Sequence, residues 1–294
     1  MSEILVVGIA VVDFVFALDA LPRRAAKYRA VEAECVGGGC AANAAVAVAR
    51  LGGNAMLCAR LGDDALGDLI LSDLGVEGVD TTLVNRAPGA KSLFSSVYVD
   101  QTGERQIVNF PGHGLAEEPD WLESAPKPDV VLVDSRWPAG AIRALELARA
   151  WDVPGIVDAE DPSEEAVLAR ASHVAFSRDG LLSFAGDQQI EAALHAADER
   201  LPGWVSVTDG EDGAFHVGAD GMKHTPAFPV ETRDTLGAGD IWHGAFALAL
   251  AETSDEGHAT WFANAAAALK CTEFGGRKGC PDRDALERFL KENT

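Results

Sequence analysis

The string Asp234-Thr235-Leu236-Gly237-Ala238-Gly239-Asp240 has the residue types that transfer of an anionic group requires. A helix-forming run at residues 241–251 follows it, so residues 237–239 would present free backbone N–H groups at a helix N-terminus. Those groups stabilise a developing anion, and a carboxylate in the first turn can take the proton of an attacking hydroxyl. The string favours phosphoryl transfer, with Asp240 as catalytic base and Gly237, Ala238 and Gly239 as anion hole. Taken alone, such a turn is also a common helix start.

Two polar positions near the N-terminus could bind a sugar. Asp13 follows the first apolar run, and Asn43 follows the string Gly37-Gly38-Gly39 at the start of an Ala-rich run. Carboxylate and carboxamide groups are the hydrogen-bonding partners that polyols need. By itself, Asp13 is equally compatible with a turn residue at the end of a strand.

Together these strings resemble the signatures of the ribokinase-like, or PfkB-type, carbohydrate kinase family. The family's D-T-x-G-A-G-D signature is matched by residues 234–240, its Gly-Gly signature by residues 37–53, and a G-x-x-G-D-D-x-x-G pattern, with Ala59 at its first position, by residues 59–67. The resemblance runs from Ile4 to beyond Pro281. It implies an ATP-dependent sugar kinase with an α/β fold, namely a ribokinase-like three-layer αβα domain with a mostly parallel central sheet and a small antiparallel β-sheet lid.

The resemblance also implies which residues bind the two substrates. The sugar would contact Asp13, Gly38, Gly39 and Asn43, besides Asp240. The nucleotide would contact a T-x-G-x-x-G loop and the anion hole, at positions Thr208, Gly210, Gly213, Gly237, Gly239 and Asn264. Glycines allow the backbone to approach a phosphate closely, although the pair Asp212-Gly213 is also a strong turn signal. The sequence contains no Walker A string, so a P-loop enzyme is not supported.

Two cations follow from the resemblance. Several family members bind a monovalent cation beside the anion hole, and the matching K⁺ ligands would be Asp234 and the carbonyls of Leu236, Lys270, Glu273 and Gly275. ATP would arrive as its Mg²⁺ complex, yet residues 176–180 lack the N-x-x-E string with which the family often organises water around Mg²⁺. The acidic cluster at residues 158–161 could substitute, although a solvated loop is the interpretation that we favour.

Three residues predict an anionic group on the sugar. In this fold Lys27, Asn109 and Arg136 would converge at the end of the sugar pocket away from ATP, where they could clamp a phosphate or a sulfonate. Surface charge is the alternative explanation for the two cations. The strings at residues 135–137, 173–177 and 275–279 are similar to bacterial sulfofructose kinases, which implies phosphorylation of the C1 hydroxyl of 6-deoxy-6-sulfofructose.

Other activities on the same scaffold stay open. A fructokinase or ketohexokinase would not need the cations, a keto-deoxy sugar acid kinase is a further candidate, and a nucleoside kinase could stack its base on Phe14, Phe16 or Tyr28. A catalytically silent sugar-binding regulator is disfavoured by the intact Asp240 and anion hole. A dehydrogenase is disfavoured because no G-x-G-x-x-G string follows the first strand. His243 could exchange protons, but such a residue more often packs beside the site.

The predicted elements bring these residues together. Apolar, β-branched runs at 4–9, 55–60, 130–134, 154–157, 173–176 and 204–208 predict buried strands, and Ala- and Leu-rich runs at 41–51, 139–150 and 190–200 predict helices. This alternation predicts a parallel sheet covered on both faces, with ligands at the carboxyl ends of its strands. Residues 14–34 and 91–112 break the rhythm and would form the lid of a single domain spanning residues 1–294. The exposed face of such a lid predicts a homodimer.

Composition limits the possible partners. The formal net charge of −22 disfavours nucleic acid and anionic lipid, and no apolar segment is long enough to span a membrane. The five cysteines show no C-x-x-C spacing, which is typical of reduced thiols rather than of a disulfide framework or zinc site. We therefore expect a cytoplasmic protein whose partner is a small sugar.

Overall fold

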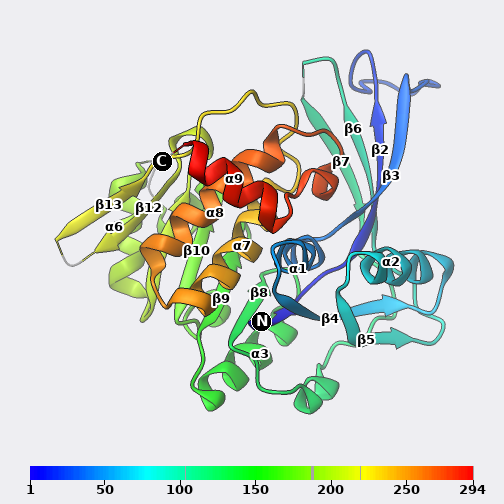
Figure 1. The fold of residues 1–294 in the computed structure, drawn as a ribbon. Helices are drawn as coiled ribbons and strands as arrows, with labels where there is room; N and C mark the ends of the chain where they lie inside the picture. Colours follow the sequence, from blue (N-terminus) through cyan, green and yellow to red (C-terminus); the bar gives the residue numbers. More distant parts are fainter. Residues whose placement is uncertain (103, 187–188, 219, 294) are drawn as a thin grey trace.

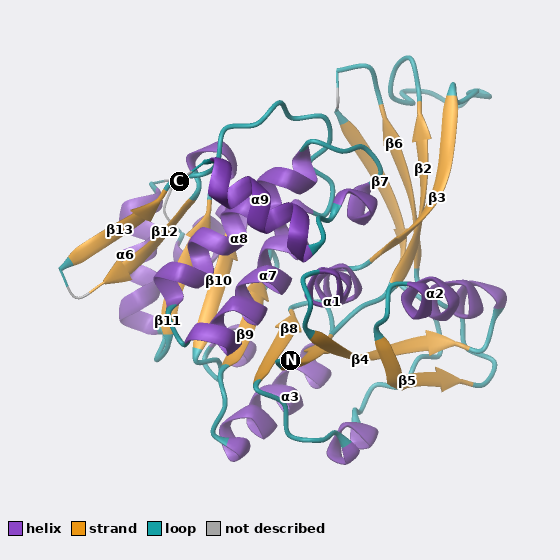
Figure 2. Cartoon of the chain, in the orientation of Figure 1, coloured by secondary structure: helices purple, strands orange, loops and turns teal. Residues whose placement is uncertain are grey.

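A nine-stranded sheet lies at the centre of the computed structural model, which describes residues 1–102, 104–186, 189–218 and 220–293. Its strand order is β13-β12-β11-β10-β9-β8-β1-β4-β5 (Figures 1 and 2). All pairings from β5 to β11 are parallel, whereas β12 and β13 add an antiparallel edge. The strands are β1 (Glu3–Val7), β4 (Asn54–Gly62), β5 (Asp80–Ala87), β8 (Val130–Asp134), β9 (Gly155–Ala159), β10 (His173–Ser177), β11 (Trp204–Thr208), β12 (Ala214–Gly218) and β13 (Gly221–Thr225).

Each face of this sheet packs against its own layer of helices. On β1, Ile4 and Val6 belong to one apolar core, and Leu5 and Val7 belong to the other. The first core includes residues of α1 (Cys40–Arg50), α2 (Ala65–Val76), α7 (Ala238–Thr253), α8 (Glu256–Cys271) and α9 (Arg283–Glu292). The second includes residues of α3 (Pro138–Trp151), α4 (Glu165–Leu168), α5 (Arg178–Ala185) and α6 (Ile190–Arg200). The predicted three-layer αβα arrangement is therefore confirmed.

A four-stranded sheet in the order β3-β2-β6-β7 projects from the central domain (Figure 1). It comprises β2 (Val11–Ala17), β3 (Glu32–Gly38), β6 (Phe94–Val99) and β7 (Arg105–Phe110). The predicted small antiparallel sheet is confirmed in its two hairpin pairings, β2–β3 and β6–β7, while the central pairing β2–β6 is parallel. A parallel pair arises because β2 and β6 come from separate segments of the chain rather than from one hairpin. We call this sheet the lid.

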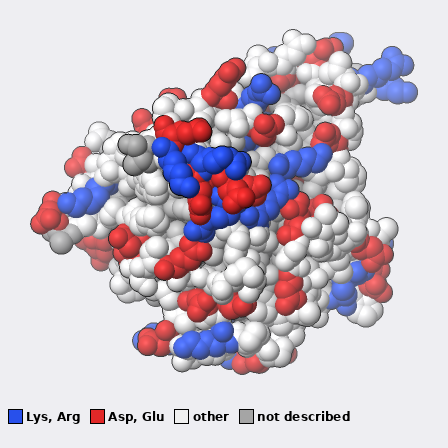
Figure 3. Space-filling model, in the orientation of Figure 1, with Lys and Arg blue, Asp and Glu red and all other residues white. Residues whose placement is uncertain are grey.

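Basic and acidic side chains are mixed over most of the face drawn in Figure 3. Lys and Arg side chains gather near α9, but acidic side chains lie among them. In this area Arg283 pairs with Glu252 and Glu287, and Arg50 pairs with Glu77. Among the described residues, no helix has the length and apolar character needed to cross a bilayer.

Candidate active site

The carboxyl ends of the central strands are held together by Asp134, the last residue of β8. Its buried carboxylate accepts hydrogen bonds from the backbone N–H groups of Ile9 (2.8 Å), Ala41 (3.2 Å) and Arg136 (3.0 Å). Burial raises the pKa of Asp134, and these N–H donors oppose the rise. One side chain thus ties the end of β1 and the start of α1 to the end of β8.

Two glycines allow the turn before α1 to pass close to the lid. Gly39 caps α1 with φ 94°, and a Cβ there would lie 2.6 Å from the carbonyl oxygen of Ile9. At Gly38 a Cβ would lie 2.0 Å from Oδ2 of Asp13 on β2. Only glycine fits either position without a shift of the backbone or of the Asp13 carboxylate. The turn therefore places Asp13 and Asn43 at one opening, as the sugar-binding prediction requires.

Asp240 lies in the first turn of α7, as the sequence predicts. Gly237, in the left-handed conformation (φ 77°), caps this helix, and the N–H of Ala238 is already donated to the carbonyl of Thr235 (3.2 Å). The N–H groups of Gly239 and Asp240 belong to the first turn, where a helix offers them no carbonyl of its own. They are the donors that an incoming anion would meet at this helix N-terminus.

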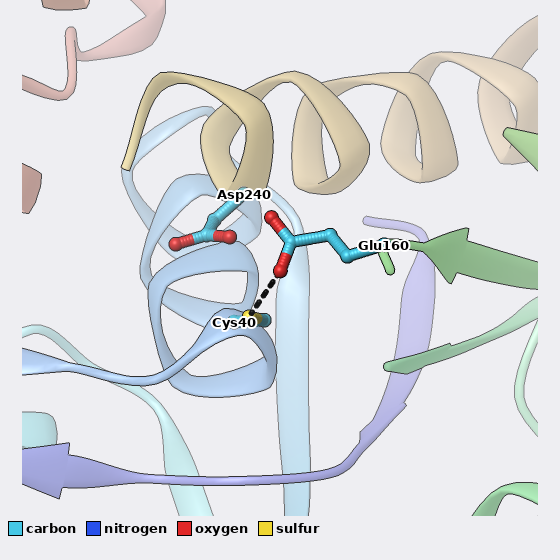
Figure 4. Close-up of side chains that lie close together, drawn as sticks. All are labelled: Cys40, Glu160 and Asp240. Atoms are coloured by element: carbon cyan, nitrogen blue, oxygen red, sulfur yellow. Dashed lines mark hydrogen bonds between the residues drawn. The ribbon is translucent and has the colours of Figure 1, made fainter. Parts of the chain in front are cut away.

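Asp240 is buried, and its surroundings suit a proton acceptor. Its Oδ2 accepts a hydrogen bond of 2.7 Å from Nδ2 of Asn43. Oxygen atoms of Asp240 and Glu160 and the sulfur of Cys40 all lie within 4.8 Å of one another (Figure 4). Burial, followed by the negative charge of Glu160, raises the pKa of Asp240 to about 6, while Asn43 opposes the rise. A base with that pKa is ionised at neutral pH and still accepts a proton readily.

A cavity of about 530 Å³ opens between Asp240 and the lid. Predicted sugar-binding residues lining it are Asp13, Gly39, Asn43, Asn109, Arg136 and Asp240, and Gly38 lies directly behind Asp13. Burial raises the pKa of Asp13, whereas Ser95 and the charge of Arg277 oppose the rise. Lys27 is not among the lining residues, because it is exposed in the loop between β2 and β3. The structure thus brings these predicted residues to one cavity, whereas Lys27 lies outside it.

A second cavity, of about 860 Å³, lies on the other side of the loop that precedes α7. The predicted nucleotide-binding residues that line it are Thr208, Gly210, Gly213, Gly239 and Asn264. Gly237 lines the first cavity and Gly239 the second, so residues 237–239 separate the two. A phosphoryl group carried from one cavity to the other would have to pass the N-terminus of α7.

The walls of the second cavity are fixed by hydrogen bonds. The Asn264 amide donates to the carbonyls of Thr225 (3.0 Å) and Pro226 (3.1 Å) and accepts from Nε1 of Trp242 (2.7 Å).

His243 is buried, and its two ring nitrogens face the carbonyls of Gly239 (2.8 Å) and Ala175 (3.2 Å). His243 therefore braces the start of α7 against β10, as expected of a residue that packs beside the site.

Two features of the first cavity were not predicted from the sequence. Arg277 lines it and pairs with Asp73 of α2, and its buried Nη1 has no hydrogen-bond partner among the described residues. The solvated loop expected at residues 158–161 is wrong for Asp158, which belongs to β9 and is 4 % exposed, whereas Glu160 follows β9, lines the cavity and has a side chain that is 36 % exposed. Burial among acidic groups, Glu160 first, raises the pKa of Asp158 well above its usual value. Sequence spacing could not reveal either feature, since Arg277 and Asp73 are 204 positions apart.

The residues expected to hold K⁺ adopt a different arrangement. Asp234 is engaged by backbone N–H groups and by the ammonium group of Lys270, whose Nζ lies 3.2 Å from Oδ2 of Asp234. Gly275 faces Asp234 with its N–H rather than with its carbonyl. The predicted K⁺ ligand set does not fit these contacts.

Comparison with known proteins agrees with the fold. Residues 1–283 match the family described as pfkB family carbohydrate kinase. The chain belongs to this family. It is 30 % identical to the ribokinase of Bacillus subtilis, over 99 % of this chain and 100 % of that protein. It is 29 % identical to an ATP-dependent ribose-1-phosphate kinase of Halopiger xanaduensis, over 95 % of each. The expected class, an ATP-dependent carbohydrate kinase, is therefore confirmed.

A solved structure extends the similarity to the whole fold. The crystal structure of a candidate ribokinase from Agrobacterium tumefaciens matches this kinase with a TM-score of 0.92 and 38 % identity, covering 99 % of this chain and 98 % of that one. The ribokinase-like fold, a large mostly parallel sheet with a smaller second sheet, is thus established for this kinase.

Proposed function

We propose that this kinase transfers the γ-phosphoryl group of ATP to a hydroxyl of a small ketose that carries a distal anionic group, with 6-deoxy-6-sulfofructose and its C1 hydroxyl as the best candidate. Asp240 would take the hydroxyl proton, while the N–H groups at the start of α7 stabilise the transferring phosphoryl group. The single observation that favours this assignment is the position of Asp240 and the α7 N-terminus between the two cavities.

The proposal of an anionic substrate rests on the two arginines of the first cavity. Arg136 is held by Oε2 of Glu160 (2.6 Å) and by the carbonyl of Asp161 (3.1 Å), and Nη1 of Arg277 has no hydrogen-bond partner in the described part of the chain. A buried guanidinium with a free donor is costly unless a ligand supplies an acceptor. A sulfonate or phosphate offers oxygen acceptors of opposite charge, and Asn109 could add an amide N–H.

The relatives include enzymes for both charged and neutral sugars. The Halopiger relative is named for ribose 1-phosphate, a charged sugar, and the Bacillus relative for ribose, a neutral one. A neutral ketose such as fructose is therefore the second candidate. It would leave Arg136 and Arg277 without a role in binding the substrate.

The acidic residues of the site fit a magnesium-bound nucleotide. Glu160 and Asp240 offer carboxylate oxygens, which Mg²⁺ prefers, whereas the Cys40 thiol is a poor ligand for it, and burial raises the pKa of that thiol. We propose that Glu160 holds Mg²⁺ or its bound water in place of the missing N-x-x-E string. Bound there, the ion would neutralise charge on the phosphates.

A substrate panel tests the proposal. We would compare kcat/KM with ATP for 6-deoxy-6-sulfofructose, fructose 6-phosphate, fructose, ribose, a keto-deoxy sugar acid and a nucleoside. We expect the sulfonated ketose to be preferred, and Arg136→Met to lower its kcat/KM roughly 10- to 100-fold while changing that of fructose little. Arg149→Met, on the exposed side of α3, is the matched control. Preference for fructose or ribose would refute the anionic substrate and leave the kinase assignment intact.

We also propose that two copies of this cytoplasmic kinase associate through their lids. The edge strand β7 exposes Ile107, Val108 and Phe110, of which Val108 is 58 % exposed. An apolar edge strand of this kind favours pairing with a second copy. Light scattering should give a dimer mass that falls to the monomer mass for Val108→Lys. A monomeric wild type at micromolar concentration would contradict the proposal.

A further inference from the structure

Lys270, in the last turn of α8, is fully buried beside the loop that forms the anion hole. Its Nζ donates to the main-chain carbonyl of Asp234 at 2.6 Å and lies 3.2 Å from Oδ2 of the same residue. Burial lowers the pKa of Lys270, and the Asp234 carboxylate opposes that shift. A buried ammonium is rarely retained without a partner of opposite charge, and Asp234 supplies it.

The Asp234 carboxylate is saturated by donors. Its Oδ1 accepts from the N–H of Leu236 (2.9 Å), and its Oδ2 accepts from the N–H groups of Gly275 (3.1 Å) and Gly276 (3.0 Å) besides facing Lys270. Burial alone would raise the pKa of Asp234, but the N–H groups and the ammonium hold it below its usual value. Together these four donors occupy both oxygens of the carboxylate.

Two of the four backbone carbonyls that the resemblance assigned to K⁺ accept hydrogen bonds as well. The carbonyl of Lys270 accepts from the N–H of Glu273 (3.2 Å), and the carbonyl of Gly275 accepts from the N–H of Lys278 (3.2 Å). A monovalent cation needs several free oxygens directed at one point. Here the Lys270 ammonium lies against the Asp234 oxygens where such an ion would have to bind.

We infer that the ammonium group of Lys270 replaces the monovalent cation, so that this kinase works without K⁺. Lys270 is then a positioning residue, because it ties the end of α8 to Asp234, which lies three residues before Gly237 in the loop that leads to α7. An ammonium supplies the same single positive charge as K⁺, but it is attached to the chain and cannot be removed by dialysis.

The wild-type enzyme gives the first test. At equal ionic strength, kcat/KM in potassium chloride and in tetramethylammonium chloride should agree within about twofold, since the two salts then screen the surface charges of the protein equally. The thermal unfolding midpoint should likewise be the same in the two salts. Activation or stabilisation that is specific to potassium would overturn the inference. The unfolding measurement does not depend on the proposed substrate, so a failure of that proposal would be distinguishable.

Variants of Lys270 provide the second test. Lys270→Ala leaves a space beside a carboxylate, and we expect its unfolding midpoint to rise by roughly 2 to 5 °C when K⁺ or NH₄⁺ replaces tetramethylammonium. Its activity should show the same new dependence on K⁺. Lys270→Met fills the space with an uncharged chain and should not respond. Lys291→Ala, exposed on α9, is the matched control. A Lys270→Ala protein that folds but whose unfolding midpoint and activity do not change with K⁺ or NH₄⁺ would contradict the inference.

Discussion

The two cavities on either side of the α7 N-terminus differ in how completely their polar groups are paired. In the second cavity, which we call the nucleotide cavity after its proposed ligand, the Asn264 amide is fully hydrogen-bonded to Trp242 and to two backbone carbonyls. In the first cavity, which we call the sugar cavity after its proposed ligand, Oδ1 of Asn43 and Nη1 of Arg277 are buried without a partner among the described residues. Unpaired buried polar groups are costly, and the proposed sugar substrate would complete the pairing of these two.

This difference suggests that one cavity serves every sugar substrate alike, whereas the other decides which sugar is used. The second cavity, proposed to bind the nucleotide, is lined by three glycines and by apolar side chains such as Phe228 and Trp242. The first cavity, proposed to bind the sugar, is lined by the charged side chains Asp13, Arg136 and Arg277. Changes on the sugar side should therefore alter which sugar is used, whereas changes on the nucleotide side should affect all sugars alike.

Among the changes that distinguish the two cavities, the largest expected effect comes from removing Arg277, whose Nη1 has no hydrogen-bond partner among the described residues although its Nη2 pairs with Asp73. Arg277→Met should lower kcat/KM for an anionic ketose roughly 10- to 100-fold, because a charge-assisted hydrogen bond to the substrate is lost. The value for fructose should change little. Steady-state kinetics on both sugars measures the ratio, with Arg149→Met as control. Equal losses on both sugars would show that Arg277 supports the fold instead.

A change on the nucleotide side should be smaller and should not depend on the sugar. Asn264→Ala removes three neutral hydrogen bonds that hold Trp242 and the segment after β13, and we expect KM for ATP to rise roughly tenfold. The KM for the sugar should stay the same. Asn293→Ala, at the exposed end of α9, is the control. A change in sugar preference would break the contrast between the two cavities.

The last expected effect is a shift in the pH profile, which is measured from the position of the acidic limb and not from the plateau rate, since Glu160→Gln would also lower that rate if Glu160 holds Mg²⁺. Asp240 must be ionised to act as base, so kcat/KM should fall as the pH drops through about 6, the raised pKa of Asp240. Glu160→Gln removes a negative charge that disfavours the ionised form. The acidic limb should then move to lower pH, by up to roughly one unit. Glu164→Gln, exposed nearby, should leave it in place, and an upward shift for Glu160→Gln would refute the electrostatic account.

The sequence predicted the elements whose residues carry a strong local signal. The apolar runs at 130–134 and 204–208 coincide with β8 and β11, because buried parallel strands are continuously apolar. The glycine-rich string at 234–240 located the start of α7, since small residues and a first-turn acid are a local pattern.

The sequence could not predict contacts between distant segments. Arg277 meets Asp73 across 204 positions, and Glu160 meets Cys40 across 120. Lys270 was expected to offer its carbonyl to a cation, but its side chain is what contacts Asp234, a choice of rotamer that no spacing encodes. Lys27 was expected in the sugar cavity, yet the loop between β2 and β3 holds it at the surface.

The most direct test of the account compares phosphoryl transfer with binding in Asp240→Asn. The variant keeps the size of the side chain and can still interact with Asn43, but it cannot accept a proton. We expect kcat for the preferred sugar to fall roughly 10²- to 10⁴-fold, as removal of a general base requires, while calorimetry shows unchanged binding of sugar and nucleotide. A variant that binds both and retains wild-type turnover would contradict the assignment of Asp240 as the catalytic base.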